Sequence, residues 1–154
     1  MIRIERDPRF WTAVAAHPAV SGAVLGLAPE RIGELAARPD MLPLAATHGG
    51  FLFARMDAMG FVAELHTLFT PEGWGREAMT AGVMALNALW LTGYQVLTTF
   101  EVEANRMSRP PITFGFQRAG DWRETPVGRL RMWILTRAGW EASPASMRRR
   151  RCLR

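Results

Sequence analysis

The sequence predicts an α/β fold built on one central sheet that mixes parallel and antiparallel strands. Three extended apolar segments, residues 42–46, 51–56 and 61–69, follow one another across short Gly-containing turns, which is typical of an antiparallel meander. A helical pattern over residues 76–92 then precedes a β-prone segment at 95–102. A helix between two strands is a crossover connection, so the strands on either side of it are expected to be parallel neighbours.

The elements outside this centre are also indicated by local signals. Asp7-Pro8 and Pro29 are typical helix starts, so two helices are expected before the meander. Residues 116–123 and 129–136 are expected to form two further strands that pair antiparallel.

Composition favours a single domain over residues 1–141, followed by a basic, disordered tail over residues 142–154. The chain has 154 residues, of which 49% are hydrophobic and 21% are charged, enough to bury an ordinary core. Its 19 basic residues exceed its 14 acidic ones, but five arginines lie within residues 148–154, so the remainder is neutral. Nucleic acid is therefore expected to bind only weakly, through the tail.

Several classes of protein do not fit the sequence. No apolar run approaches the roughly 20 residues that span a bilayer, and the first residues are too polar for a signal peptide. The single cysteine, Cys152, allows no disulfide within the chain and makes a structural metal cluster unexpected. We therefore expect a cytoplasmic protein without a metal and without a membrane partner.

The turn between the third strand and the long helix has the residues of an anion site. Gly73 and Gly75 lie just before the expected helix start, where backbone N–H groups lack partners and the helix dipole is positive. Glycine allows an anion to approach the backbone closely. A tight turn without a ligand explains the same residues, and no Gly-Lys-Ser/Thr motif of a nucleotide-binding loop follows.

The strand before this turn carries one carboxylate and one imidazole. Glu64 and His66 share a face of it by the alternation of side chains along a strand. A carboxylate in so apolar a strand is costly unless it is paired or lies at a wet cleft. A cross-strand partner such as Arg55 would satisfy Glu64 equally well, and a lone histidine in a strand is often structural.

The order of elements resembles the GNAT superfamily of N-acetyltransferases over about residues 1–136. The family's loop motif, Gln/Arg-x-x-Gly-x-Gly/Ala, matches residues 70–75 at both glycines, although Thr70 stands where Gln or Arg is usual. Asn105 and Gly115-Phe116 also occupy suitable places. The resemblance implies a mixed sheet of about six or seven strands with about three or four helices.

The resemblance further implies acetyl-CoA as co-substrate and an amine as acceptor. Glu64 would be the general base, and His66 could share that role. The pantetheine arm would pair with strand backbone, the pyrophosphate would meet the loop amides, and a backbone N–H near Leu68 would polarise the acetyl carbonyl. The cofactor-binding residues so implied are Leu68, Phe69, Thr70, Gly73, Trp74, Gly75, Arg76 and Asn105.

One departure from the family pattern leaves a second reading open. The family's usual general acid is a Tyr four residues before the Gly-Phe pair, and Pro111 stands there. The alternative is a catalytically inactive GNAT-like binding or structural module, such as an accessory component of a phage-like particle. A homo-oligomer or a larger assembly would fit that alternative.

Overall fold

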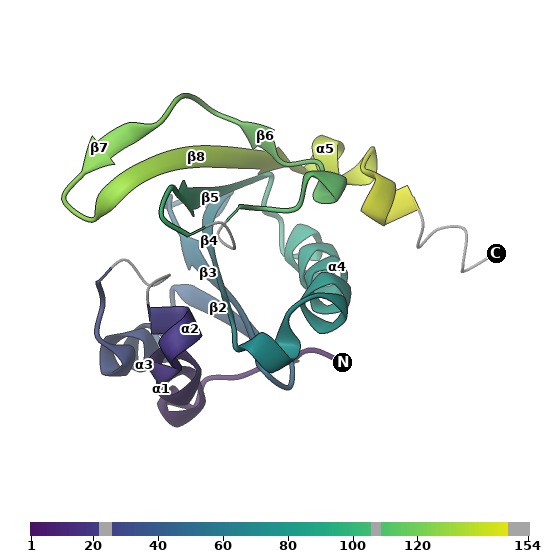
Figure 1. Cartoon of the computed structure of the whole chain (residues 1–154). Coiled ribbons are helices and arrows are strands. Elements are labelled where there is room, and N and C mark those ends of the chain that lie inside the picture. Colours follow the sequence, from purple (N-terminus) through teal and green to yellow (C-terminus); the bar gives the residue numbers. More distant parts are fainter. Residues whose placement is uncertain (22–25, 106–108, 148–154) are drawn as a thin grey trace.

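An eight-stranded sheet separates two layers of helices (Figure 1). The structure is a computed structural model, and it describes residues 1–21, 26–105 and 109–147. The strands lie in the order β1-β2-β3-β4-β5-β8-β6, and β7 also pairs with β8. The strands are β1 (Arg3–Ile4), β2 (Met41–Ala45), β3 (Gly49–Arg55), β4 (Val62–Phe69), β5 (Val96–Val102), β6 (Gln117–Arg118), β7 (Arg123–Thr125) and β8 (Gly128–Thr136).

Helices cover both faces of this sheet. The first three lie together on one face, and α4 lies on the other, with α5 near the end of β8 (Figure 1). The helices are α1 (Pro8–Ala16), α2 (Pro18–Ser21), α3 (Pro29–Ala37), α4 (Arg76–Leu91) and α5 (Arg137–Glu141), with 3₁₀ turns η1 (Pro71–Gly73) and η3 (Ile112–Phe114).

The predicted meander and crossover are confirmed. Strand β3 pairs antiparallel with β2 and with β4. Strand β4 pairs parallel with β5, and helix α4 connects the two strands along the chain. The described sheet has eight strands, one more than the six or seven expected, because the predicted strand over residues 116–123 is divided. Gly120, with φ of 152°, interrupts it, and β6 and β7 each pair separately with β8.

Alternation along β4 divides the core into two clusters. Leu65 and Phe69 pack with α4 and with Phe51 and Phe53 of β3, while Leu68 packs on the other face with Trp11 and its neighbours in α1 and α3. Both faces of β4 are therefore covered, so a polar side chain on this strand is either satisfied or faces a cavity.

Residues 142–147, which the sequence reading placed in a disordered tail, pack on the domain. Residues 144–147 are helical, and Ser143 and Ser146 are buried beside Trp140, whose indole is in the core. The Ser143 hydroxyl accepts a hydrogen bond from the Ser146 amide at 3.2 Å. The first residues of the expected tail therefore belong to the domain, and residues 148–154 lie outside the described part of the chain.

Candidate functional site

Strands β4 and β5 separate halfway along their length. Their parallel pairing extends only from Val62–Val96 to Glu64–Thr98, whereas β4 stays paired with β3 up to Phe69. The Thr99 hydroxyl donates a hydrogen bond to the carbonyl of Leu65 at 2.9 Å, the last direct link between the strands described here. Beyond it a cavity of about 490 Å³ opens, a volume within the range of small-molecule sites.

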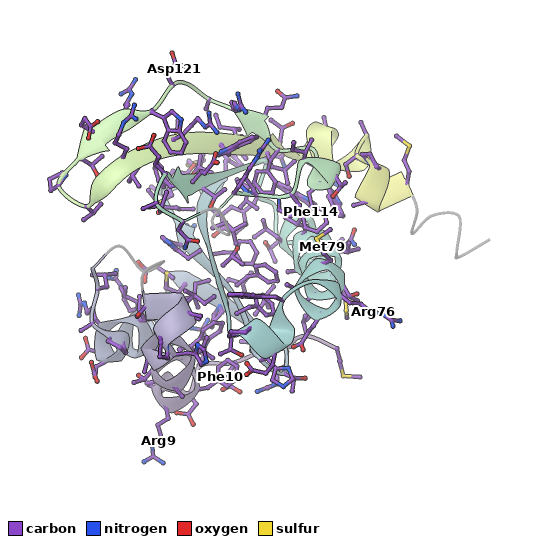
Figure 2. The ribbon with its side chains drawn as sticks, in the orientation of Figure 1. Arg9, Phe10, Arg76, Met79, Phe114 and Asp121 are labelled. Atoms are coloured by element: carbon purple, nitrogen blue, oxygen red, sulfur yellow. The ribbon has the colours of Figure 1, made fainter. Side chains whose placement is uncertain are left out.

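The cavity reaches both faces of the sheet. On one side it is lined by residues of α4 and by Phe114, whose side chain points toward that helix (Figure 2). On the other side it is lined by residues of α2, α3 and β2. Two molecules entering from opposite faces could therefore meet in the gap between β4 and β5.

The backbone of β4 presents alternate residues to this gap. The carbonyl of Val62 and the amide of Thr70 bond to Met56 and His48, the residues that flank β3. The carbonyl of Phe61 accepts from the amides of Gln95 and Val96 at the start of β5. Because N–H and C=O groups alternate in direction along a strand, the groups of Leu68 are directed to β3 and those of Thr67 and Phe69 to the gap. The Leu68 backbone, which the resemblance implied would pair with the cofactor, therefore faces β3 and not the gap.

The start of α4 carries amides that no side chain caps. Gly75 is its N-cap, with φ of 77° and ψ of −114°, and no side-chain hydrogen bond to this cap is described. A Cβ at Gly75 would meet nothing within 4 Å. The amides of Gly75, Arg76 and Glu77 therefore remain available to an anion, as the sequence predicts for this helix start.

Gly73 has a different role from the one expected. Its amide donates to the carbonyl of Thr70 at 2.9 Å inside the 3₁₀ turn, so it is not a free donor for a phosphate. A Cβ there would lie 2.8 Å from Cδ1 of Phe69 and 3.0 Å from Cβ of His48. Gly73 is needed for close packing of the turn on the sheet.

We expect Gly73→Ala to destabilise the fold by about 1–3 kcal/mol, because the added methyl group overpacks the contact with Phe69. Chemical denaturation would measure the change. Gly139→Ala is the matched control, since it lies in a helix and its Cβ would lie 3.2 Å from the Thr136 hydroxyl, with the next atoms at 3.6 and 3.8 Å. Equal stabilities of the two variants would contradict the packing role of Gly73.

Of the other predicted cofactor residues, Trp74 and Asn105 line the cavity and Thr70 and Arg76 do not. The indole of Trp74 donates to the carbonyl of Phe69 at 3.0 Å, which fixes the end of β4 to the helix start. The Thr70 hydroxyl donates to the carbonyl of His48 at 3.4 Å. Asn105 lines the cavity from the β5 side, and Arg76 extends into solvent at the start of α4 (Figure 2).

Glu77 secures the start of α4 to the sheet. Its carboxylate accepts hydrogen bonds from the amides of Thr47 and His48 and pairs with Nδ1 of His48 at 2.7 Å. Partial burial alone would raise the pKa of Glu77, but these hydrogen bonds and the His48 ring lower it below its usual value. The sequence reading did not identify this contact, because it joins residues 29 and 30 positions apart.

Glu64 and His66 form a pair at the cavity wall. Nε2 of His66 lies 3.2 Å from Oε1 of Glu64, and their side chains are 42% and 19% exposed. The His66 ring lines the cavity, and Glu64 lies behind it. The alternative in which Arg55 satisfies Glu64 does not match the structure, where the Arg55 guanidinium donates to the carbonyl of Ala58.

The surroundings of His66 keep its ring neutral. The protein atoms around the ring disfavour its charged form and lower the pKa, and the nearby Glu64 carboxylate only partly offsets this effect. A neutral ring whose Nε2–H is donated to Glu64 has a free lone pair on Nδ1. The pair therefore has the composition of a general base and the group that orients it.

Arg109, Pro110 and Pro111 also line the cavity, and the sequence reading had assigned none of them a binding role. Tyr94 packs against the core beyond the C-terminal end of α4. It therefore does not take the place of the tyrosine that the resemblance would lead one to expect where Pro111 stands. Within the described ranges, no group of three or more His, Cys, Asp or Glu side chains could hold a metal ion. The same part of the chain contains no helix that is long and apolar enough to cross a membrane.

Comparison with protein-family models and with curated protein sequences finds no match. Solved structures do match. A probable acetyltransferase of the GNAT family from Chromobacterium violaceum superposes with a TM-score of 0.71 at 20% identity, over 92% of this chain and 89% of that one. Spermidine N-acetyltransferase from Vibrio cholerae, in complex with CoA and spermine, gives 0.71 at 14% identity, over 91% and 96%.

Another match is the aminoglycoside acetyltransferase AAC(6')-Ib in complex with coenzyme A and kanamycin, with a TM-score of 0.69 at 17% identity. The match covers 92% of this chain and 96% of that chain. At these identities the agreement concerns the backbone, and it extends over nearly the whole of each protein. The chain therefore has the fold of the GNAT acetyltransferases.

Proposed function

We propose that the protein transfers an acetyl group from acetyl-CoA to a primary amine. The observation that carries this proposal is the cavity at the separation of β4 and β5, which has open helix amides at one side and the His66–Glu64 pair at the other. The fold shared with acetyltransferases that bind coenzyme A supports it.

The binding role falls to two sets of backbone donors. The amides of Gly75, Arg76 and Glu77 receive the pyrophosphate, since an anion is stabilised at a helix N-terminus. The gap-facing groups of Thr67 and the gap-facing amide of Phe69 align the pantetheine arm and direct its thioester to the gap, while the Phe69 carbonyl stays bonded to Trp74. A gap-facing N–H of β4 donates to the acetyl carbonyl oxygen, where negative charge develops during attack.

His66 supplies the proton transfer. Its free ring nitrogen removes a proton from the amine as the amine nitrogen bonds to the acetyl carbon, and the bond from that carbon to the CoA sulfur then breaks. Glu64 holds the ring and stabilises the imidazolium that forms. Water protonates the departing thiolate, because Pro111 occupies the place of the family's usual acid.

Isothermal titration with acetyl-CoA tests the proposal directly. At a free concentration of 100 times its dissociation constant, acetyl-CoA would stabilise the fold by about 2.7 kcal/mol. Thermal unfolding should then show Tm raised by about 5–10 °C. Release of free thiol in the presence of amines then measures turnover. Absence of binding at millimolar acetyl-CoA would leave the GNAT-like binding module as the better description.

Arg76→Glu is expected to weaken acetyl-CoA binding by about tenfold at low salt and less at high salt, because it places a negative charge at the phosphate site. Arg123→Glu is the matched control, since Arg123 is exposed on β7, far from the start of α4 (Figure 1). Titration calorimetry at two salt concentrations measures both. An equal loss in both variants would attribute the effect to net charge alone.

A further inference from the structure

The part of the cavity on the α1–α3 face is apolar. We call it the apolar compartment, and it is lined by Val20, Leu27, Ile32, Leu35, Met41 and Leu52. Several of these side chains also belong to the core cluster on that face. Leu27 is 44% exposed and Leu35 is half-buried, so these two stand where the compartment opens to solvent.

No carboxylate lines the cavity. Its described lining contains the polar side chains of His66, Thr67, Thr99, Asn105 and Arg109, but neither Asp nor Glu. The stretches that the structure does not describe, residues 22–25, 106–108 and 148–154, contain no Asp or Glu either. The charge that the lining itself contributes at neutral pH is therefore positive, from Arg109.

Three carboxylates outside the lining are already engaged. Glu101 interacts with the Arg109 charge and accepts hydrogen bonds from Arg131 and Trp133. Glu64 lies behind the His66 ring and pairs with it. On α3, Glu34 is exposed and pairs with Arg31 at 2.7 Å. None of the three lines the cavity, and each already has a partner.

We propose that the apolar compartment receives the body of the acceptor, and that this acceptor is a primary amine on an alkyl or aryl group without further positive charges. The inference rests on the proposed function, because it assigns the acceptor side of the same cavity. It distinguishes this chain from structural neighbours whose complexes contain kanamycin or spermine, both of which carry several amino groups.

The physical reason is the cost of desolvating charge. Each additional ammonium group of a polyamine would leave water for a wall whose described lining has no carboxylate. An alkyl or aryl body gains free energy from the same transfer, in proportion to the apolar area it buries. His66 at the inner end then meets the single amino group.

Ligand-observed NMR titrations of the full chain, alone and saturated with CoA, test the inference without requiring turnover. We expect 2-phenylethylamine to bind at least tenfold more tightly than spermine or kanamycin. Equal affinities, or tighter binding of spermine or kanamycin than of 2-phenylethylamine, would overturn it.

A charge placed in the compartment provides a second test. Leu35→Glu adds one carboxylate on a half-buried helix position and should strengthen spermine binding while weakening 2-phenylethylamine at least fivefold. Leu35→Gln is the matched control of equal size without charge, and it should not strengthen spermine binding. Unchanged affinities in the Glu variant would contradict the placement of the acceptor beside α3.

The alternative occupant of the apolar compartment is a long acyl chain of the CoA thioester. If octanoyl-CoA binds at least tenfold more tightly than acetyl-CoA and displaces 2-phenylethylamine, the compartment holds an acyl chain and the inference is wrong. Failure of the proposed function looks different, since neither CoA thioester would then bind, whereas the preference among amines is measured on the protein alone.

Discussion

Replacing His66 with Asn is expected to lower kcat for amine acetylation by about 100-fold or more, the usual effect of removing a general base. The dissociation constant of acetyl-CoA should change by less than about twofold, because the proposed phosphate donors are backbone amides at the start of α4. Steady-state kinetics with thiol detection and titration calorimetry separate these two effects.

The pH dependence gives the same residue a second signature. Burial lowers the pKa of His66 below 6.5, despite the opposing effect of Glu64. The base is therefore more than half neutral at pH 6.5, and the acidic limb of kcat at saturating amine should have its midpoint below that pH. The acidic limb should be absent in His66→Asn.

Glu64→Gln tests the orienting role. Removal of the carboxylate charge removes the one influence that raises the His66 pKa, so the acidic limb should move to lower pH and kcat should fall about tenfold. His17→Asn is the matched imidazole control, because the His17 ring accepts a hydrogen bond from the neighbouring amide of Ala19 and lies outside the Glu64–His66 pair. If the kcat of His66→Asn were within threefold of the parent value, His66 would not be the general base.

Local sequence signals were sufficient for the frame of the site. The three-strand meander follows from apolar runs separated by Gly-containing turns, and the parallel pairing of β4 and β5 follows from the helix between them. Gly75 before a helical pattern predicted an open helix start, and the structure has one. The juxtaposition of Glu64 and His66 follows from alternation along one strand.

The remaining features depend on distances between separate parts of the chain. No local pattern specifies that β4 and β5 part after Glu64 and Thr98, so the direction of the Leu68 backbone could not be predicted. The two glycines of one motif differ because only Gly73 lies against Phe69. The packing of residues 142–147 on the domain depends on the burial of Ser143 and Trp140, which local sequence does not specify.

Glu101 is the acidic side chain with the largest expected effect on stability. The sequence reading chose Glu64 as the costly carboxylate, but Glu101 on β5 is more deeply buried. Its Oε2 accepts hydrogen bonds from Arg131 at 2.7 and 3.1 Å and from the indole of Trp133 at 2.8 Å. The Arg131 guanidinium also lies 4.4 Å from the ring centroid of Trp122.

Glu101→Ala is expected to destabilise the fold by about 3–5 kcal/mol, because it leaves the Arg131 charge buried without its partner. The double variant Glu101→Leu with Arg131→Met should regain most of that loss, since no buried charge is left unpaired. Urea denaturation would measure both. Glu34→Gln, in an exposed pair with Arg31, is the control and should change stability by less than about 1 kcal/mol.

The pH dependence of stability should report the ionisation of Glu101 directly. Burial alone would raise the pKa of Glu101, but the hydrogen bonds from Arg131 and Trp133 and the charge of Arg131 hold it below 4.5. A carboxylate with a lowered folded-state pKa stabilises the fold above 4.5, and this contribution is lost as the pH falls through its folded-state value. The free energy of unfolding of the parent should therefore fall more steeply below pH 4.5 than that of Glu101→Gln. Parallel curves for the two proteins would show that the carboxylate is not stabilised by its three donors.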